Sequence, residues 1–169
     1  MRALVFLLAF VLSGFALELK ELDFLKKERF ASEFKLTKKL NGFERALLSF
    51  GFLELKDGVL FYEIKKPIYS LIKIDKNGVF VQGEEGFEPL EGAYDKGLFL
   101  ALLNLDLDEL SKNFSLNLSG DKNAWVLTLT PSNVWLAKIF TYIKLEGGKK
   151  LSKIILLEKN KDLSLYELL

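Results

Sequence analysis

The chain has 169 residues, of which 50% are hydrophobic and 28% charged, and it contains neither cysteine nor histidine. This composition suits one folded domain, and 15 Phe, 5 Tyr and 2 Trp exclude a disordered chain. Without cysteine the protein has no disulfide, thiol nucleophile or zinc–thiolate site, and without histidine it has no Ser–His or Cys–His catalysis. The formal charge of +1 does not favour nucleic-acid binding.

Residues 1–16 have the pattern of a secretory signal peptide. Arg2 provides a basic start, an unbroken apolar run follows it, and Gly14 and Ala16 are small residues at the −3 and −1 positions of a cut after Ala16. The apolar stretch is shorter than the roughly 20 residues that a membrane-spanning helix needs. We therefore expect residues 17–169 to form a single exported domain in the periplasm.

The exported domain is expected to begin with a helix. Residues 17–30 place Leu19, Leu22 and Leu25 near one face, with lysine and glutamate on the other. From Ala31 onward the sequence changes to short apolar runs separated by turn residues, which is typical of antiparallel strands.

Three β-hairpins are predicted, each from a turn sequence between two apolar runs. The strongest signal is Asp57-Gly58, because this dipeptide supplies the left-handed backbone that a two-residue hairpin turn requires. The hairpins join, in chain order, residues 46–55 to 59–64, 70–74 to 79–82, and 114–118 to 124–130.

The remaining segments are a loop, a helical region and a C-terminal meander. Residues 83–94 are rich in glycine and are predicted to form a loop. Residues 97–114 are predicted to form two short helices divided near Asn104. The meander is predicted to contain strands at 134–145, 151–158 and 163–168.

The predicted strands carry apolar residues on both faces, whereas an antiparallel sheet with one solvated face alternates cleanly. In the strand at 46–55, the two faces hold Leu48, Phe50 and Phe52 on one side and Leu47, Leu53 and Leu55 on the other. This pattern allows two interpretations. One is a thick ordinary core, and the other is a curved sheet that encloses a hydrophobic cavity with helices as its plug.

The order and spacing of several short motifs resemble one protein family. The motifs are Phe30-Ala31-Ser32-Glu33-Phe34, Ser49-x-Gly51-x-Leu53, Tyr62 followed by Pro67, the hairpin Ile74–Val81, Leu127-Thr128-Leu129-Thr130-Pro131, and Gly147-Gly148 to Leu157. Together with the signal sequence they resemble the LolA-like family, the periplasmic carriers of outer-membrane lipoproteins. The resemblance covers roughly Leu22 to Leu168.

The resemblance implies a fold, a function and partners. The fold is α+β, a curved, unclosed antiparallel β-barrel (a half-barrel) with α-helices plugging its concave face. The function is to bind the acyl chains of lipoproteins in a hydrophobic cavity and ferry them from the inner to the outer membrane. It implies a monomer that uses no cofactor, is not an enzyme, is loaded by an inner-membrane ABC-type exporter and is unloaded by an outer-membrane acceptor.

Candidate site residues follow from this expected half-barrel. The expected cavity wall consists of Leu48, Phe50, Phe52, Tyr62, Ile72, Trp125 and Leu127. The expected helical lid consists of Phe99, Leu100 and Leu103.

The turn after the strand at 46–55 departs from the family pattern. Well-studied carriers have an Arg-Pro pair whose arginine latches the lid and serves onward transfer, whereas this chain has Leu55-Lys56-Asp57-Gly58. Lys56 is the candidate handover residue, although lysine lacks the planar fork of arginine. Two alternatives therefore stay open, a carrier of another envelope lipid or glycolipid, and a LolA-like sensor module that detects lipoproteins and regulates signalling.

Two acidic groups point to other chemistry. Two of the carboxylates of Glu84, Glu85 and Glu88 could serve as the general acid and base of a glycoside hydrolase. The sequence, however, places them in a solvated loop. The cluster at 106–109 lacks the loop length, central glycine and closing glutamate of a calcium hand. We expect neither catalysis nor metal binding from these groups.

Overall fold

The computed structural model describes residues 18–25, 29–90 and 96–169. The predicted signal peptide lies outside these residues. Within them, no helix combines the length and apolar character that crossing a bilayer requires.

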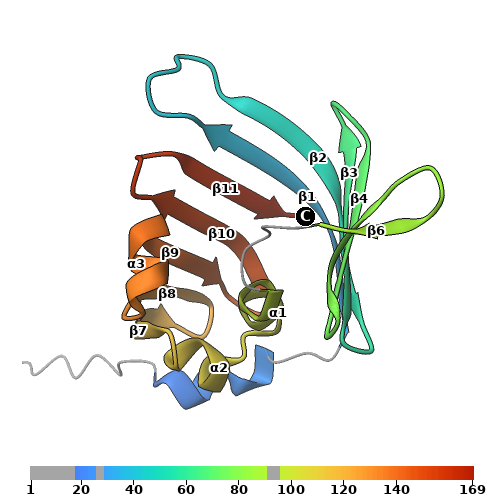
Figure 1. The fold of residues 1–169 in the computed structure, drawn as a ribbon. Coiled ribbons are helices and arrows are strands. Elements are labelled where there is room, and N and C mark those ends of the chain that lie inside the picture. The colour runs from blue at the N-terminus through green and yellow to red at the C-terminus, as the bar shows by residue number, and fades with distance from the viewer. Residues whose placement is uncertain (1–17, 26–28, 91–95) are drawn as a thin grey trace, which may run out of the picture.

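The eleven strands of the described residues belong to one antiparallel sheet, which curves strongly and stays open between its edge strands β6 and β7 (Figure 1). Their order in the sheet is β6-β5-β4-β3-β2-β1-β11-β10-β9-β8-β7. The strands are β1 Phe30–Lys39, β2 Leu47–Lys56, β3 Val59–Lys66, β4 Ser70–Asp75, β5 Gly78–Gln82, β6 Phe87–Pro89, β7 Phe114–Asp121, β8 Ala124–Pro131, β9 Phe140–Gly147, β10 Leu151–Glu158 and β11 Leu163–Leu168.

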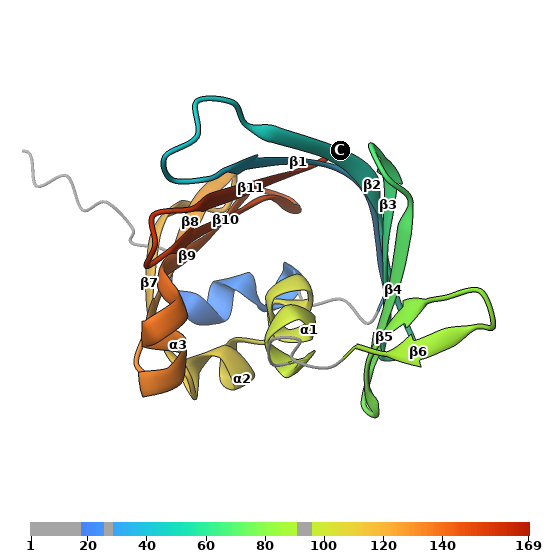
Figure 2. The ribbon, with the colours of Figure 1, turned by 45° about the horizontal axis from the view of Figure 1, so that its top comes forward.

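The helices are short, and several of them lie inside the curve of the sheet. We call strands β2–β6 one arm of the sheet and strands β7–β11 the far arm. Figure 2 shows α1 between the two arms, with the 3₁₀ helix η1 and α2 beside it and α3 at the rim next to β9. The helical bounds are η1 Leu19–Leu25, α1 Lys96–Asn104, α2 Leu107–Ser111 and α3 Val134–Ile139. The prediction of a curved, open antiparallel sheet with helices is therefore confirmed at this level.

The three predicted hairpins are confirmed, and their turns show why the sequence signals them. Asp57 and Gly58 have φ values of 52° and 76°, the left-handed conformation that aspartate and glycine tolerate best. In the β4–β5 turn, Asp75 Oδ1 accepts a hydrogen bond from the Asn77 backbone N–H at 2.7 Å. Asp121 Oδ1 accepts the equivalent bond from Asn123 in the β7–β8 turn, also at 2.7 Å. The two helices predicted within 97–114 are present as α1 and α2.

The structure corrects three expected elements. The helix expected at 17–30 is the shorter η1, and the chain is already paired in β1 at Phe30, which lies opposite Leu55. The loop expected at 83–94 contains the short edge strand β6. The strand expected at 134–145 begins as helix α3, because the Asn133 side chain accepts a hydrogen bond from the Trp135 backbone N–H at 2.8 Å and caps the helix.

The core lies on the concave side of the sheet, against the helices. Along β2, Leu53 and Leu55 are buried while Leu48 and Phe50 on the other face are exposed. On the far arm of the sheet, Trp125 is fully buried and donates its indole N–H to the Gly148 carbonyl at 2.8 Å.

Candidate apolar cavity

A cavity of about 310 Å³ lies between the concave face of the sheet and helix α1. Strands from both arms contribute to it, so its residues are distant in sequence and are brought together only by the curvature of the sheet. Its lining consists of Leu53, Leu60, Tyr62, Ile72, Ile74, Val79, Leu90, Phe99, Leu102, Leu103, Ile154, Leu156 and Tyr166.

Every lining residue that the structure describes is aliphatic or aromatic, and none of these carries a charge. The only polar groups on these side chains are the hydroxyls of Tyr62 and Tyr166. Such a lining attracts hydrocarbon through the hydrophobic effect and offers no fixed charge to a polar ligand. The volume is at the lower end of the range of about 300–1,000 Å³ that is typical of ligand sites.

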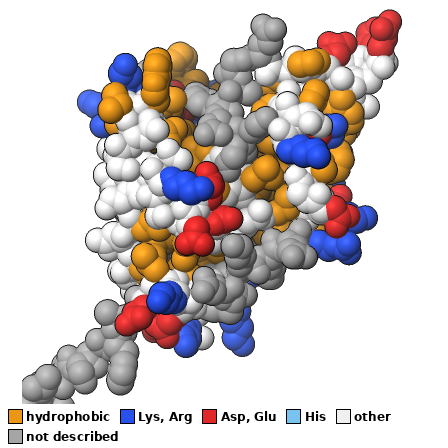
Figure 3. All heavy atoms as spheres, turned by 60° about the horizontal axis from the view of Figure 1, so that its bottom comes forward, with side chains coloured by type: hydrophobic (Ala, Val, Ile, Leu, Met, Phe, Trp, Pro, Cys, Tyr) orange, Lys and Arg blue, Asp and Glu red, His pale blue; other side chains and the backbone are white. Residues whose placement is uncertain are grey.

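Helix α1 forms one wall of the cavity. Leu102 and Leu103 are buried, whereas Phe99 is partly exposed. Leu90, just after the edge strand β6, is 41% exposed and also lines the cavity. The cavity therefore reaches the surface near Leu90. In the space-filling view from below, hydrophobic side chains reach the molecular surface (Figure 3).

Two aromatic rings of the sheet-side wall, Tyr62 and Tyr166, pack against a third ring, Phe34, behind them. Phe34 is buried and stacks on Tyr62, with ring centroids 5.2 Å apart and planes 14° from parallel. Tyr166 packs against both, at 5.7 Å from Phe34 and 6.4 Å from Tyr62. Burial raises the pKa of both tyrosine hydroxyls, and the neighbouring Tyr166 raises that of Tyr62 further. Both tyrosines therefore stay neutral at physiological pH.

Gly51 makes room for this aromatic group. It lies opposite Phe34 across β1 and β2, and a β-carbon built on it would be 1.9 Å from the Glu63 carbonyl oxygen and 2.6 Å from the Phe34 ring. Only glycine fits beneath the ring at this position. The family-like motif Ser49-x-Gly51-x-Leu53 therefore has a local packing reason.

Four of the ten predicted wall and lid residues line the cavity. Tyr62 and Ile72 lie on the neighbouring strands β3 and β4, opposite one another, while Phe99 and Leu103 come from α1. The structure thus brings together two residues from each predicted group.

The placement of Leu48, Phe50 and Phe52 on the cavity wall is wrong. Strand β2 turns the opposite face inward, the one that carries Gly51, Leu53 and Leu55, because Phe34 needs the space above Gly51. Phe50 is 42% exposed on the outer face, and the Phe52 ring there contacts the Lys65 ammonium at 5.4 Å.

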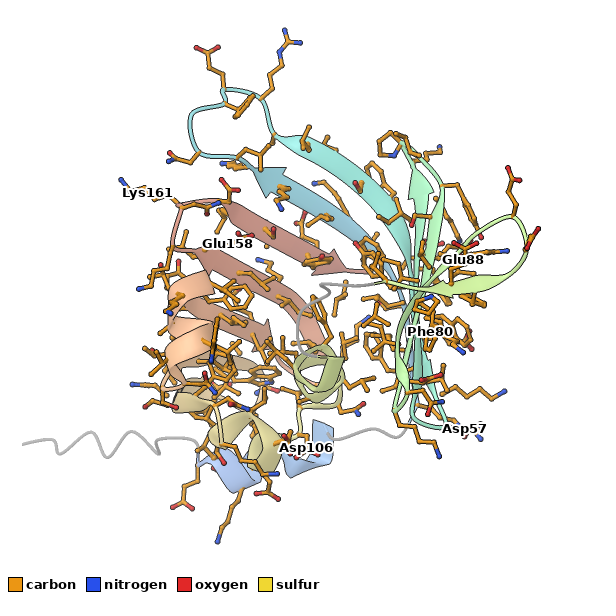
Figure 4. The ribbon with its side chains drawn as sticks, viewed as in Figure 1. Asp57, Phe80, Glu88, Asp106, Glu158 and Lys161 are labelled. Atoms are coloured by element: carbon orange, nitrogen blue, oxygen red, sulfur yellow. The ribbon has the colours of Figure 1, made fainter. Side chains whose placement is uncertain are left out.

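The other predicted residues also lie away from the cavity. Trp125 and Leu127 are buried in the far arm of the sheet, and Leu100 packs against the core without lining the cavity. Lys56 is exposed on the outer face at the end of β2, beside the Asp57 turn that Figure 4 labels.

Sequence reasoning missed most of the lining. The missed residues are Leu53, Leu60, Ile74, Val79, Leu90, Leu102, Ile154, Leu156 and Tyr166. The glycine at position 51 was the available signal for β2, since a small residue opposite Phe34 marks the face on which aromatic rings pack.

The carboxylates considered for catalysis or metal binding do not form a site. Glu84 and Glu85 are exposed in the loop between β5 and β6, and Glu88 is exposed in β6, at the edge of the sheet (Figure 4). Asp106 caps α2 by accepting a hydrogen bond from the Glu109 backbone N–H at 3.2 Å. Within the part of the chain that the structure describes, no cluster of three or more acidic side chains could hold a metal ion.

The sequence matches no family model and no curated protein. The geometry of the cavity is therefore the main guide to function.

Proposed function

We propose that this protein is a LolA-like periplasmic carrier that binds the acyl chains of outer-membrane lipoproteins in its apolar cavity and ferries them from the inner to the outer membrane. The observation that carries the proposal is the cavity of about 310 Å³, among whose described lining residues none has a charged side chain. An acyl chain is the ligand that such a lining favours, because each buried methylene contributes roughly 0.8 kcal/mol.

The position of α1 supports a carrier that loads and unloads. This helix supplies one wall of the cavity through Phe99, Leu102 and Leu103, so a small movement of one element changes the accessible volume. A longer acyl chain requires that movement, because the volume of the cavity is at the small end of the range for ligand sites. Binding then competes with the packing of α1 on the sheet, which keeps loaded and empty states close in free energy.

The cavity lining does not account for recognition of the polar head of the cargo. The described part of the lining offers two tyrosine hydroxyls and no cation, and Lys56 lies outside it on the outer face. This favours recognition of the hydrocarbon alone, so a carrier of another envelope lipid is the second candidate. In either case the protein acts without a cofactor and without catalysis, as a partner of an inner-membrane exporter and an outer-membrane acceptor.

The test is to purify the protein from the periplasm of its own cells without detergent and to identify its load by native mass spectrometry. We expect a lipoprotein to co-purify in a one-to-one complex that dissociates when its acyl chains are removed. A complex with a free phospholipid or glycolipid in place of a lipoprotein would select the second candidate. A protein that stays empty, even after cross-linking in the cell, would contradict both.

A further inference from the structure

The most exposed hydrophobic side chains of the described residues lie at one rim of the sheet. Ile68 is 79% exposed, Trp135 74%, Val134 72% and Phe43 71%. The β1–β2 loop contains Phe43, the β3–β4 loop contains Ile68, and α3 contains the other two.

The strand register places these segments at the same end of the strands. Phe50 pairs with Lys66, so the start of β2 lies beside the end of β3 and the loop that follows it. On the other side of β1, Lys39 pairs with Leu163, which brings the β10–β11 turn to the same rim, and Glu158 at this turn pairs with Phe140 at the end of α3. Figure 1 shows the β1–β2 loop projecting beyond the rest of the sheet.

The projecting strand end is apolar on both faces. Leu47 and Leu48 are adjacent in β2, so they point to opposite faces, and both are about half exposed. Tyr69, next to Ile68, is 58% exposed. We call these five side chains the rim patch; its members are Phe43, Leu47, Leu48, Ile68 and Tyr69. At the opposite rim, the large hydrophobic side chains exposed among the described residues are those of Leu90 and Leu169.

Basic side chains surround the rim patch. Residues 38–48 and 65–69 contain five lysines and arginines and one carboxylate, Glu44. Two of these lysines form ion pairs with carboxylates outside these ranges, Lys38 with Glu158 at 3.9 Å and Lys65 with Glu63 at 4.0 Å. Lys39, Arg45 and Lys66 are exposed, and within the described residues no ion pair neutralises them. Along the same rim, Lys138 lies over the exposed Trp135 ring at 4.8 Å.

We propose that the rim patch docks the protein on an anionic lipid membrane, with Phe43 and Ile68 inserted at the headgroup level and the surrounding lysines and arginines on the lipid phosphates. Exposed aromatic and aliphatic tips with a basic surround are the combination that an anionic bilayer interface attracts. The core of a protein–protein interface is instead depleted in lysine. This docking surface is separate from the cavity and adds to the proposed carrier function a place where the carrier meets the membrane.

The test is co-sedimentation of the purified protein with phosphatidylcholine vesicles that contain or lack about 30% phosphatidylglycerol. We expect binding to the anionic vesicles only, weakened by salt. Phe43→Ser combined with Ile68→Ser should reduce that binding about tenfold or more, because both inserted side chains are lost. Arg45→Gln combined with Lys66→Gln should reduce it roughly thirtyfold, since each cation near an anionic surface contributes independently.

The matched control for charge is Lys149→Gln combined with Lys150→Gln, two exposed lysines at the opposite rim, and it should bind as the unmodified protein does. The proposal would be overturned if this control lost as much binding, if the Phe43 and Ile68 variant bound as before, or if neutral vesicles bound equally well. It would also be overturned if the rim bound a protein partner but no vesicle. A cavity-filling change, Val79→Phe, should leave vesicle binding intact, so that failure of the carrier function and failure of membrane docking are separable.

Discussion

At the scale of single residues, the wall of the cavity depends on a few tight aromatic contacts. Phe34 lies over Gly51 and stacks on Tyr62, while the Tyr166 ring packs at an angle against both. Among the described lining residues, the two tyrosines present the only hydroxyls. Aromatic pairs in such arrangements contribute about 0.5–1.5 kcal/mol each beyond the area they bury. The cluster therefore gives the cavity a rigid wall opposite α1.

The raised pKa values of Tyr62 and Tyr166 predict how stability changes in alkali. In the unfolded chain a tyrosine ionises near pH 10, whereas in the folded protein burial holds both hydroxyls protonated. Their contribution is complete below pH 10 and is lost as the pH rises above it, by about 1 kcal/mol per pH unit for each tyrosine.

Urea unfolding at pH 8 and pH 11 measures this loss. In the variant Tyr62→Phe combined with Tyr166→Phe, the alkaline loss of unfolding free energy should be smaller by that amount. The exposed Tyr69→Phe is the control and should behave as the unmodified protein does. An alkaline loss of the same size in the double variant would show that these tyrosines ionise in the folded state.

At the scale of elements, turn chemistry was readable from the sequence and strand orientation was not. The three hairpins follow from aspartate, asparagine and glycine residues that act locally, as the Asp75 and Asp121 side chains show. The segment after Pro131 was expected to be a strand, but the cap supplied by Asn133 makes Val134–Ile139 a helix. Local signals thus predicted the turns well. They misassigned Val134–Ile139, where a single capping residue determines that the segment is a helix and not a strand.

The orientation of β2 depends on a contact with another strand. Its two faces are similarly apolar, so the hydrophobic pattern alone does not distinguish them. The face that carries Gly51 turns inward because the Phe34 ring of β1 lies on the glycine.

Replacement of Gly51 tests this explanation. Gly51→Ala should destabilise the protein by about 2 kcal/mol or more, since its β-carbon would meet the Glu63 carbonyl and the Phe34 ring. Gly78→Ala is the matched control, because its β-carbon would meet only the Phe80 ring at 3.4 Å, and it should cost less than about 1 kcal/mol. Urea midpoints measure both. Equal effects of the two substitutions would mean that Gly51 does not fix the orientation of β2.

At the scale of the whole molecule, the cavity arises from the curvature of the sheet. Its lining joins residues as distant as Leu53, Phe99 and Tyr166, and the concave face meets α1 only because both arms of the sheet bend toward it. The apolar content of the strands was readable from the sequence, whereas the pattern left both an ordinary core and a curved sheet open as interpretations, and the curved, open sheet was expected from the resemblance alone. Four of the expected residues reach the cavity. The others could not be placed, because their position depends on register and curvature that no local pattern encodes.

The measurement that tests the central claim most directly is the binding of palmitate to the purified protein. It is monitored through the displacement of a bound fluorescent fatty acid by palmitate. We predict saturable binding that Val79→Phe removes, because the added ring occupies the cavity, while stability changes by no more than about 1 kcal/mol. Phe50→Asp, on the outer face of β2, should bind palmitate as the unmodified protein does. Loss of binding in Phe50→Asp with full binding in Val79→Phe would place the ligand outside the cavity and contradict the account.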